Sequence, residues 1–572
     1  MKSIKTSSSP KNKPSFWRRL DNNLLLYLVG FLLVFIPLYP KIPLFDLMEG
    51  YIVRLRLEDI LIALTAFVWL IQVWRGKAKF PKNVFTVFLF SYLLVGFLSA
   101  IDAVFVLHTV PLQTKHLFKL GLHYFRRIEY FSMYFFAYAA IRNKDDLLRL
   151  LKVSLVALIG TIIYGFGQKY LYWPAFSTMN REFSKGMRLY LTAHSRVMST
   201  FAGHYDFAAY LMMALIFLIT AMWLSKLWWQ KVIFATLGFF AYWSLILTAS
   251  RTSWLGYVVG LTVVAFVLAF NRGWWWSFKR WLTVVFLSIL IMFTLGDLSD
   301  RFLQLVNDPN TLAKFLPYTP NQIETQIHHV REFTAKVNDF KEKLLSPFES
   351  AEPPANSIST DELAQIAAKS DQPPTSSKEE AEISHRPLPP DVTPEQDKIR
   401  QEAMLRDATA SATVSANLKK GGGYSPNALK YGLSIAIRLD ALWPRAIAGF
   451  KRNPLLGSGY STLVKTQPNQ FTQAESTDND YLRMLGETGL LGAFTFLMLP
   501  LLVIYFSFKA WRQLSDPNLK IIALSLIAAT VALLVNATYI DIFESSKVAY
   551  TYWFLAALAT HLWRFSHEAQ QT

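Results

Sequence analysis

The sequence contains no cysteine among its 572 residues. This absence excludes disulfide bonds, thiolate metal sites and a cysteine nucleophile, so any chemistry must use oxygen or nitrogen groups. Charged residues are also scarce, at 17%, whereas hydrophobic residues make up 52% of the chain. This composition carries more apolar surface than one aqueous core can cover, and it predicts an integral membrane protein.

A phosphate-binding loop of the nucleotide-binding type is missing as well. The glycines at 421–423 are not followed by the Gly-Lys-Ser/Thr spacing that such a loop needs, which argues against an ATP-driven pump. Acidic residues are fewer than basic ones, and the net charge is +18. Membrane proteins gather lysine and arginine in cytoplasmic loops, so this charge predicts a lipid bilayer as partner and no nucleic acid.

Long apolar runs predict an all-α polytopic membrane protein with about twelve transmembrane helices. The expected spans run from about 23 to 39, 58 to 74, 84 to 101, 128 to 141, 150 to 168, 203 to 224, 232 to 249, 253 to 270, 281 to 297, 487 to 508, 519 to 537 and 547 to 565. The fourth is the weakest, because His123, Arg126, Arg127 and Glu129 crowd its start. An interfacial helix there is the alternative.

Basic residues in the short connections predict the orientation of the chain. They gather in four connections, near 75–82, 142–152, 226–231 and 272–280. Placing these connections in the cytoplasm makes both termini cytoplasmic. The predicted regions are a basic tail at 1–22, a first membrane domain of nine helices at 23–297, an extracytoplasmic loop at 298–486, a second membrane domain of three helices at 487–565, and a tail at 566–572.

The large loop between helices 9 and 10 has two kinds of composition. Its stretch from about 346 to 424 is rich in Pro, Ser, Glu, Lys and Ala and has almost no aromatic residues, so it is predicted to be disordered. The stretch 430–485 returns to apolar residues and arginine. Most of the candidate chemistry therefore lies in the second stretch.

Arg251 sits in a polar turn between two strongly apolar spans, with hardly any loop around it. A charge at that depth normally faces a polar cavity or a partner, and the alternative is a side chain that reaches the headgroup phosphates. Arg438 and Arg445 are seven residues apart and are predicted to share one face of an amphipathic helix, although Pro444 interrupts it. A ligand-binding face and a solvated face both explain that spacing.

A proline and glycine turn at 453–460, with Gly457 and Gly459, is expected to let the backbone approach a ligand closely. Acidic residues follow this turn. Asp478, Asp480 and Glu487 lie at the mouth of the next span. They are either helix-capping and headgroup-facing residues or candidates for a general base.

In this order, the motifs resemble the O-antigen ligase and polymerase-like glycosyltransferases of the bacterial envelope. That family shows a Ser-Arg turn between two central spans, then an outer loop with Arg, Trp and a Pro, Leu, Gly-x-Gly turn, and a His-Asn-x-Tyr-Leu run closing on Glu-x-Gly. The matching residues here are Ser250, Arg251, Arg438, Trp443, Pro454, Gly457, Gly459, Asn479, Tyr481, Leu482, Glu487 and Gly489. Asp478 stands where the family has histidine, and its ordinary pKa of about 3.9 makes it a different base from imidazole.

The resemblance implies an inverting, metal-independent glycosyltransferase without a cofactor. It would move a glycan from a polyprenyl diphosphate carrier to an acceptor hydroxyl, on a glycan, lipid or protein, at the outer face of the bacterial cytoplasmic membrane. Arginine forks match phosphate oxygens, so Arg251 and Arg438 are expected to bind the diphosphate, with Arg188 or Arg196 assisting.

The same resemblance implies roles for the loop residues. Asp478 or Glu487 would deprotonate the acceptor. The residues expected to position the glycan or the loop are Trp443, Gly457, Gly459, Asn479 and Tyr481. A transporter or flippase for lipid-linked glycans is the alternative, but it predicts corresponding motifs in two halves of the chain, and the sequence shows none. A scaffolding protein would tolerate loss of these arginines.

Overall fold

The structure is a computed structural model, which describes residues 16–48, 54–178, 183–191, 195–295, 437–463 and 476–571, together with positions 336 and 435. The predicted disordered stretch 346–424 lies outside the described residues. The long helices are α1 (Phe16–Leu38), α2 (Leu57–Trp74), α3 (Val84–Phe105), α4 (Thr114–Ala140), α5 (Lys144–Tyr170), α6 (His204–Leu224), α7 (Trp228–Leu247), α8 (Arg251–Arg272), α9 (Trp274–Leu295), α19 (Asp480–Gln513), α20 (Pro517–Asn536) and α21 (Ser546–Gln571). The shorter elements are β1 (Pro43–Asp46), β2 (Arg54–Arg56), the 3-10 turns η1 (Phe183–Lys185) and η3 (Ile542–Glu544), the π-helical turn η2 (Arg438–Leu442), and α18 (Trp443–Arg452).

Ten of these helices are long and apolar enough to cross a membrane. This confirms the prediction of an all-α, multi-pass membrane protein. The remaining two expected spans, at 128–141 and 547–565, fall within α4 and α21, which carry more polar residues. These two helices pack against each other, and Lys119, Arg127 and Lys547 on them are buried. Their charges therefore contact protein rather than lipid. The same polar residues lower the mean hydropathy of both helices, so hydropathy alone marks them as weak spans.

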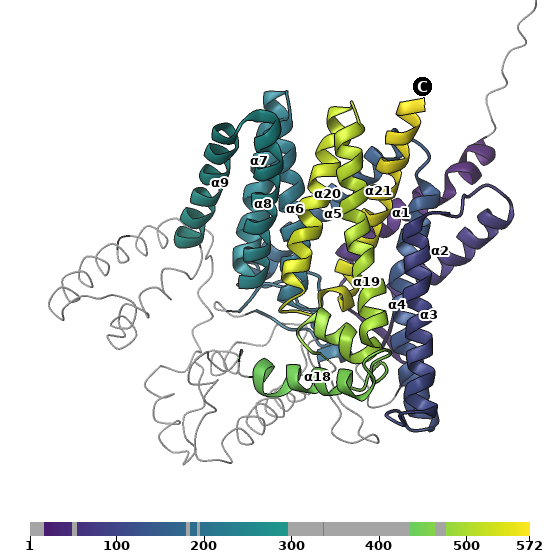
Figure 1. Cartoon of the computed structure of the whole chain (residues 1–572). Helices are drawn as coiled ribbons and strands as arrows, with labels where there is room; N and C mark the ends of the chain where they lie inside the picture. Colours follow the sequence, from purple (N-terminus) through teal and green to yellow (C-terminus); the bar gives the residue numbers. More distant parts are fainter. Residues whose placement is uncertain are drawn as a thin grey trace, which may run out of the picture.

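The last three long helices join the two sides of the bundle (Figure 1). α20 packs against α6 and α8, whereas α19 packs against α3 and α21 packs against α4. On α8, Gly256 and Gly260 allow close approach to α20, because an added Cβ would lie 2.9 Å from the Ala532 carbonyl oxygen and 3.2 Å from that of Ala528. Small residues four apart serve the same purpose in many membrane helix pairs.

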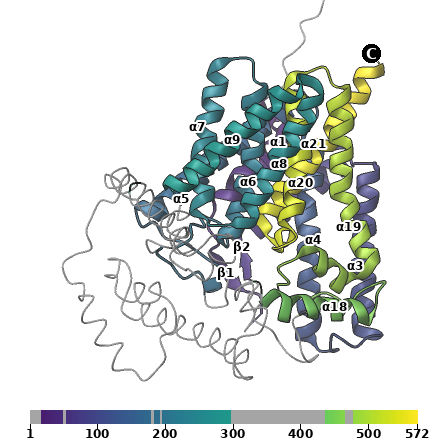
Figure 2. The ribbon, with the colours of Figure 1, turned by 60° about the vertical axis from the view of Figure 1, so that its left-hand side comes forward.

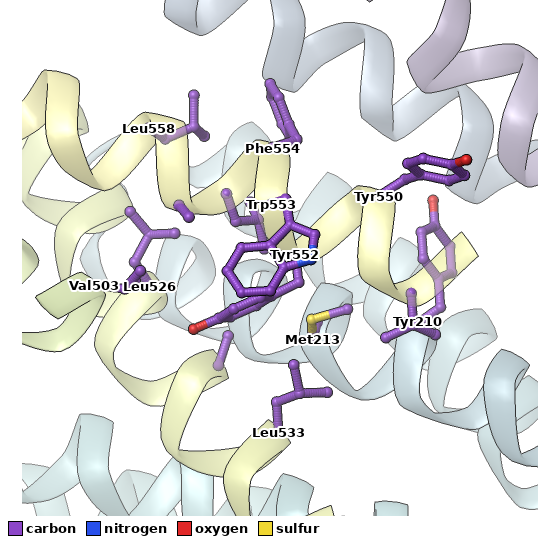
Figure 3. Packing of buried hydrophobic residues seen from close by; sticks show 14 of the residues in the cluster. Tyr210, Met213, Val503, Leu526, Leu533, Tyr550, Tyr552, Trp553, Phe554 and Leu558 are labelled. Atoms are coloured by element: carbon purple, nitrogen blue, oxygen red, sulfur yellow. The ribbon is translucent and has the colours of Figure 1, made fainter. Parts of the chain in front are cut away.

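Aromatic side chains fill the hydrophobic core around α21 (Figure 3). Trp553 of α21 is fully buried, and its ring centroid lies 4.5 Å from that of Phe131 on α4. Tyr552 and Val503 belong to the same buried cluster and come from α21 and α19. The core thus ties the middle of α21 to both sides of the bundle.

One end of the bundle carries most of the irregular structure (Figure 2). The β1–β2 hairpin lies there between α1 and α2, and α18 runs across the same end. Lys547, at the start of α21, donates to the carbonyl oxygens of Pro37, Tyr39 and Thr200 at 3.0, 2.7 and 2.7 Å. It satisfies carbonyl groups at the end of α1 that the helix itself leaves without partners. We call this the α18 end of the bundle.

Candidate functional site

The α18 end contains a break in α19 that the sequence alone does not reveal. Gly489 has φ 66° and ψ −165°, so the first turns of α19 stop there and a second helical segment begins. The break leaves carbonyl groups of the first segment without helical partners. The 454–459 turn supplies donors, because the Ser458 and Gly459 amides bond the Gly486 and Glu487 carbonyl oxygens at 2.8 and 3.0 Å.

Gly457 and Gly459 were predicted to allow close approach of a backbone. The structure shows that this approach is to neighbouring protein. A Cβ on Gly457 would lie 2.5 Å from the carbonyl carbon of Glu487, and a Cβ on Gly459 would lie 2.3 Å from the Cβ of Ala103 on α3. Both glycines have positive φ, at 71° and 93°. The glycine turn therefore fixes the broken helix in place.

Replacement of Gly489 by alanine should destabilise the protein by about 1–3 kcal/mol, because its backbone conformation is almost restricted to glycine and the new Cβ would lie 2.4 Å from the Leu455 carbonyl carbon. Denaturant titration of the detergent-solubilised protein measures this loss. Gly238→Ala on α7 is the matched control, since its Cβ would meet nothing within 4 Å. Equal effects at the two positions would show that the break at Gly489 is not strained against Leu455.

A buried ion-pair network lies beside the helix break. Arg127 of α4 places Nη2 2.7 Å from Oε2 of Glu487 and 2.8 Å from Oε1 of Glu544. Arg483 reaches the same Glu487 at 3.5 Å and Asp541 at 3.0 Å. The Arg127 guanidinium also stacks on Tyr460, 4.1 Å from the ring centroid. Two arginines thus face three carboxylates in the protein interior.

Charge balance determines the ionisation of this network. Burial alone would raise the pKa of Glu544, but the positive charges of Arg127 and Arg483 outweigh burial and hold that pKa below its ordinary value. Glu487, one of the predicted general bases, is buried and accepts from the Ser461 amide as well as from both arginines. Through these contacts, Glu487 anchors α19 to α4.

Asp541 organises the turn that precedes α19. It accepts from the Thr477 amide and hydroxyl, both at 2.8 Å, from the Ser476 hydroxyl at 2.9 Å, and from the Asn479 amide at 2.8 Å. A carboxylate that collects so many donors fixes the backbone around it. The position of Asp478 is therefore set by Asp541.

Asp478 is the most accessible carboxylate of this group. Its side chain is 32% exposed, and its Oδ2 lies 2.8 Å from Nη2 of Arg438. Burial, with the nearby negative charge of Asp541, raises the pKa of Asp478 against the opposing effects of Ser476 and Arg438. The backbone has φ 50°, a conformation that Asp, Asn and His adopt more readily than most residues. The Asp478 carboxylate is therefore both accessible to solvent and more basic than an ordinary aspartate.

Arg438 does not belong to a solvated face, which was one of the two interpretations of its spacing from Arg445. It is 5% exposed, whereas Arg445 is exposed, so the two arginines do not share an environment. The physical reason is the π-helical turn η2, whose wider backbone turn changes the register before α18 begins. Pro444 lies in the first turn of α18 and interrupts no helix there. The Arg438 guanidinium stacks on Tyr539, 4.1 Å from the ring centroid.

Arg251 lies at the same end of the bundle as Arg438. It is the first residue of α8 and is exposed. Ser253, two residues further along α8, accepts a hydrogen bond from Nδ2 of Asn536 at 2.9 Å. Asn536 ends α20, and Tyr539, on which Arg438 stacks, follows it by three residues. The start of α8 therefore packs against the end of α20, whereas Arg438, paired with Asp478, lies against the turn that follows α20.

The other predicted residues occupy different places around this end. Arg196 is exposed and its Nη1 lies 3.1 Å from Nε2 of His204, and Arg188 is exposed on the segment that pairs with Ala175. Asn479 caps α19 and donates to the Thr538 carbonyl oxygen at 2.9 Å. Arg196 and Asn479 thus contact His204 and Thr538, whereas Arg438 contacts Asp478 and Tyr539.

Two further predicted residues lie on the elements that carry Asp478 and Arg438. The Tyr481 hydroxyl donates to the Leu534 carbonyl oxygen at 2.7 Å, which joins the start of α19 to α20. Trp443 is half-buried at the start of α18, directly after the π-helical turn.

Sequence reasoning missed Arg127, Arg483, Asp541 and Glu544 as parts of the site. Two signals were present. Arg483 and Glu487 are four residues apart, which places them on one helix face, and Asp541 with Glu544 puts two acids in a short connection between apolar spans. Neither signal shows that these groups meet Arg127, since that contact joins positions 360 residues apart.

Comparison with known proteins assigns no family to this chain. No protein-family model matches it, and no curated protein matches its sequence. The geometry of the α18 end therefore carries the functional interpretation.

Proposed function

We propose that the protein is an inverting glycosyltransferase that moves a glycan from a polyprenyl diphosphate carrier to an acceptor hydroxyl. The observation that supports this best is the ion pair of Asp478 and Arg438 at the α18 end, with exposed Arg251 at the same end of the bundle. An accessible carboxylate paired with a guanidinium, together with a second arginine at this end, supplies the groups that such a transfer requires. A polyprenyl tail would lie in the surrounding bilayer.

In the proposed reaction, Asp478 accepts the proton of the acceptor hydroxyl. The resulting oxygen attacks the anomeric carbon, the bond from that carbon to the diphosphate breaks, and polyprenyl diphosphate leaves. Arg251 and Arg438 stabilise the negative charge on the leaving group through charge-assisted hydrogen bonds. Glu487 acts behind Asp478 as an anchor, because its oxygens already accept from Arg127 and Arg483.

We further propose that the α18 end faces the outside of a bacterial cytoplasmic membrane and that both termini are cytoplasmic. The basic connections near 75–82, 142–152, 226–231 and 272–280 lie at the end of the bundle opposite α18 (Figure 1). Short loops rich in lysine and arginine favour the cytoplasmic side. This orientation places the proposed site in the leaflet where a lipid-linked glycan meets surface acceptors.

Replacing Arg251 by alanine should lower transfer about tenfold to a hundredfold, because it removes charge-assisted hydrogen bonds to the diphosphate. Arg251 is exposed, so the fold should survive the change. The assay follows polyprenyl diphosphate released by detergent-solubilised protein that is given a polyprenyl diphosphate glycan and cell-envelope acceptors. Arg438→Ala is tested beside it.

Arg445→Ala is the matched control, since this arginine is exposed on α18 seven residues from Arg438. It should keep wild-type transfer. Full activity in both Arg251→Ala and Arg438→Ala would contradict the proposed site. A carrier of lipid-linked glycans would use the same charges without chemistry, and it would release no polyprenyl diphosphate with any acceptor.

A further inference from the structure

A second concentration of arginine and tryptophan lies at the end of the bundle opposite α18. We call residues 272–280 the α8–α9 corner, where Gly273 joins α8 directly to α9 (Figure 1). Gly273 has φ 93°, which allows the chain to reverse without a loop. Trp274 and Trp275 are 60% and 67% exposed at this corner. Exposed tryptophans at the end of a membrane helix are typical of the interface with lipid headgroups.

Two guanidiniums at this corner share one indole. The Arg280 guanidinium carbon lies 4.0 Å from the centroid of Trp276, and that of Arg272 lies 6.0 Å from the same centroid. Lys279 lies over the neighbouring Trp275 at 5.0 Å. Like charges held this close repel each other, and the cost is larger beside the apolar phase than in water. A bound anion would offset that cost.

The protein itself supplies no such anion in the part of the chain that the structure describes. No Asp or Glu occurs between Asp206 and Asp297, and no described carboxylate forms an ion pair with Arg272, Lys279 or Arg280. Two of the other basic connections at this end, 75–82 and 142–152, do pair with a carboxylate. Arg75 pairs with Asp21, and Lys144 pairs with Asp516.

A second basic and aromatic turn lies at the same depth. α7 and α9 run in the same direction, and the Tyr242 hydroxyl of α7 donates to the Ser288 carbonyl oxygen of α9 at 2.9 Å. Tyr242 lies as many residues after Trp228, the first residue of α7, as Ser288 lies after Trp274, the first residue of α9. Trp228 at the start of α7 is therefore level with Trp274 at the start of α9. Both turns meet the same layer of the membrane.

We infer that the α8–α9 corner binds the phosphate headgroup of an anionic phospholipid. Arginine forks match phosphate oxygens, and the Trp276 indole holds both guanidiniums in place for that contact. Phe278 in the corner and Phe286 further along α9 are exposed, where acyl chains would lie. The ligand is a lipid rather than free phosphate because the site opens onto this apolar surface.

The test measures binding of phosphatidylglycerol and of phosphatidylcholine to the purified, delipidated protein by native mass spectrometry. Phosphatidylglycerol should bind more tightly. Arg272→Gln with Arg280→Gln should weaken its binding about thirty-fold, the effect of two basic groups at a lipid surface. Arg272→Lys with Arg280→Lys keeps both charges and should retain most of the binding.

Lys509→Gln with Arg512→Gln on α19 is the matched control. These exposed cations also stack on aromatic rings at this end of the bundle, but on two separate rings, Tyr505 and Phe508. The control should leave phosphatidylglycerol binding unchanged. An equal loss in both double variants, equal binding of the two lipids, or full competition by inorganic phosphate would each overturn the inference. Should the glutamine pair prevent folding, the single variants decide, each with a weakening of about fivefold expected.

Discussion

Replacement of Glu487 by alanine is expected to lower the free energy of unfolding by about 3–5 kcal/mol, because it leaves Arg127 and Arg483 buried with less compensating charge. Of the remaining carboxylates, Glu544 already pairs with both arginines and Asp541 pairs with Arg483. Loss of Glu487 also leaves the Ser461 amide without its acceptor. The measurement is unfolding in mixed micelles of rising SDS fraction, followed by tryptophan fluorescence.

Two further variants sharpen this result. Glu487→Gln keeps an acceptor at the position but removes the charge, so it should lose less stability than alanine. Arg149→Ala breaks an ion pair at 3.4 Å whose arginine is 66% exposed, and it should change stability by less than about 1 kcal/mol. If Glu487→Ala has no larger effect than Arg149→Ala, the buried network does not hold α4 to α19.

Replacement of Asp478 by asparagine is expected to reduce transfer by about 10²–10⁴-fold, the usual contribution of a general base. Asparagine tolerates the positive φ at this position, so the turn should keep its form. Because burial and Asp541 raise the pKa of Asp478, the wild-type rate should fall on acidification at a higher pH than an ordinary aspartate would give. The measurement is the pH profile of polyprenyl diphosphate release.

The Asp478→His variant distinguishes two roles of Asp478, a general base and a carboxylate that only holds the structure. Imidazole can accept the proton and also tolerates positive φ, so this variant should retain transfer with its acidic limb moved towards pH ~6.5. Asp46→Asn removes a half-exposed carboxylate from the same end of the bundle and should leave the profile unchanged. An unaltered pH profile in Asp478→Asn would assign the acidic limb to another group and contradict the role of Asp478.

Apolar runs were sufficient to predict the membrane helices. Their lengths depend on local composition, and ten helices satisfy that criterion directly. The expected start of the tenth span at 487 was late, because α19 begins at Asp480. Hydropathy marks where a helix becomes apolar, whereas the N-cap at Asn479 and its bond to Leu482 mark where the helix begins.

The site was predictable where neighbours in sequence act together and not where distant segments meet. Arg438 and Asp478 were both candidates, but their ion pair depends on how the π-helical turn directs Arg438, which spacing alone does not show. Gly457 was expected to approach a ligand, and its place against Glu487 follows from the break in α19. Such contacts depend on tertiary packing, which a residue's own neighbours do not encode.

The contact of Lys547 with Pro37 joins positions 510 residues apart, and this separation bears on biogenesis. The carbonyl groups at the end of α1 leave the ribosome long before the amine that satisfies them. Until α21 is inserted, water or lipid headgroups must solvate these carbonyls. Insertion of α21 then replaces that solvent with the Lys547 amine, which joins the end of α1 to Thr200.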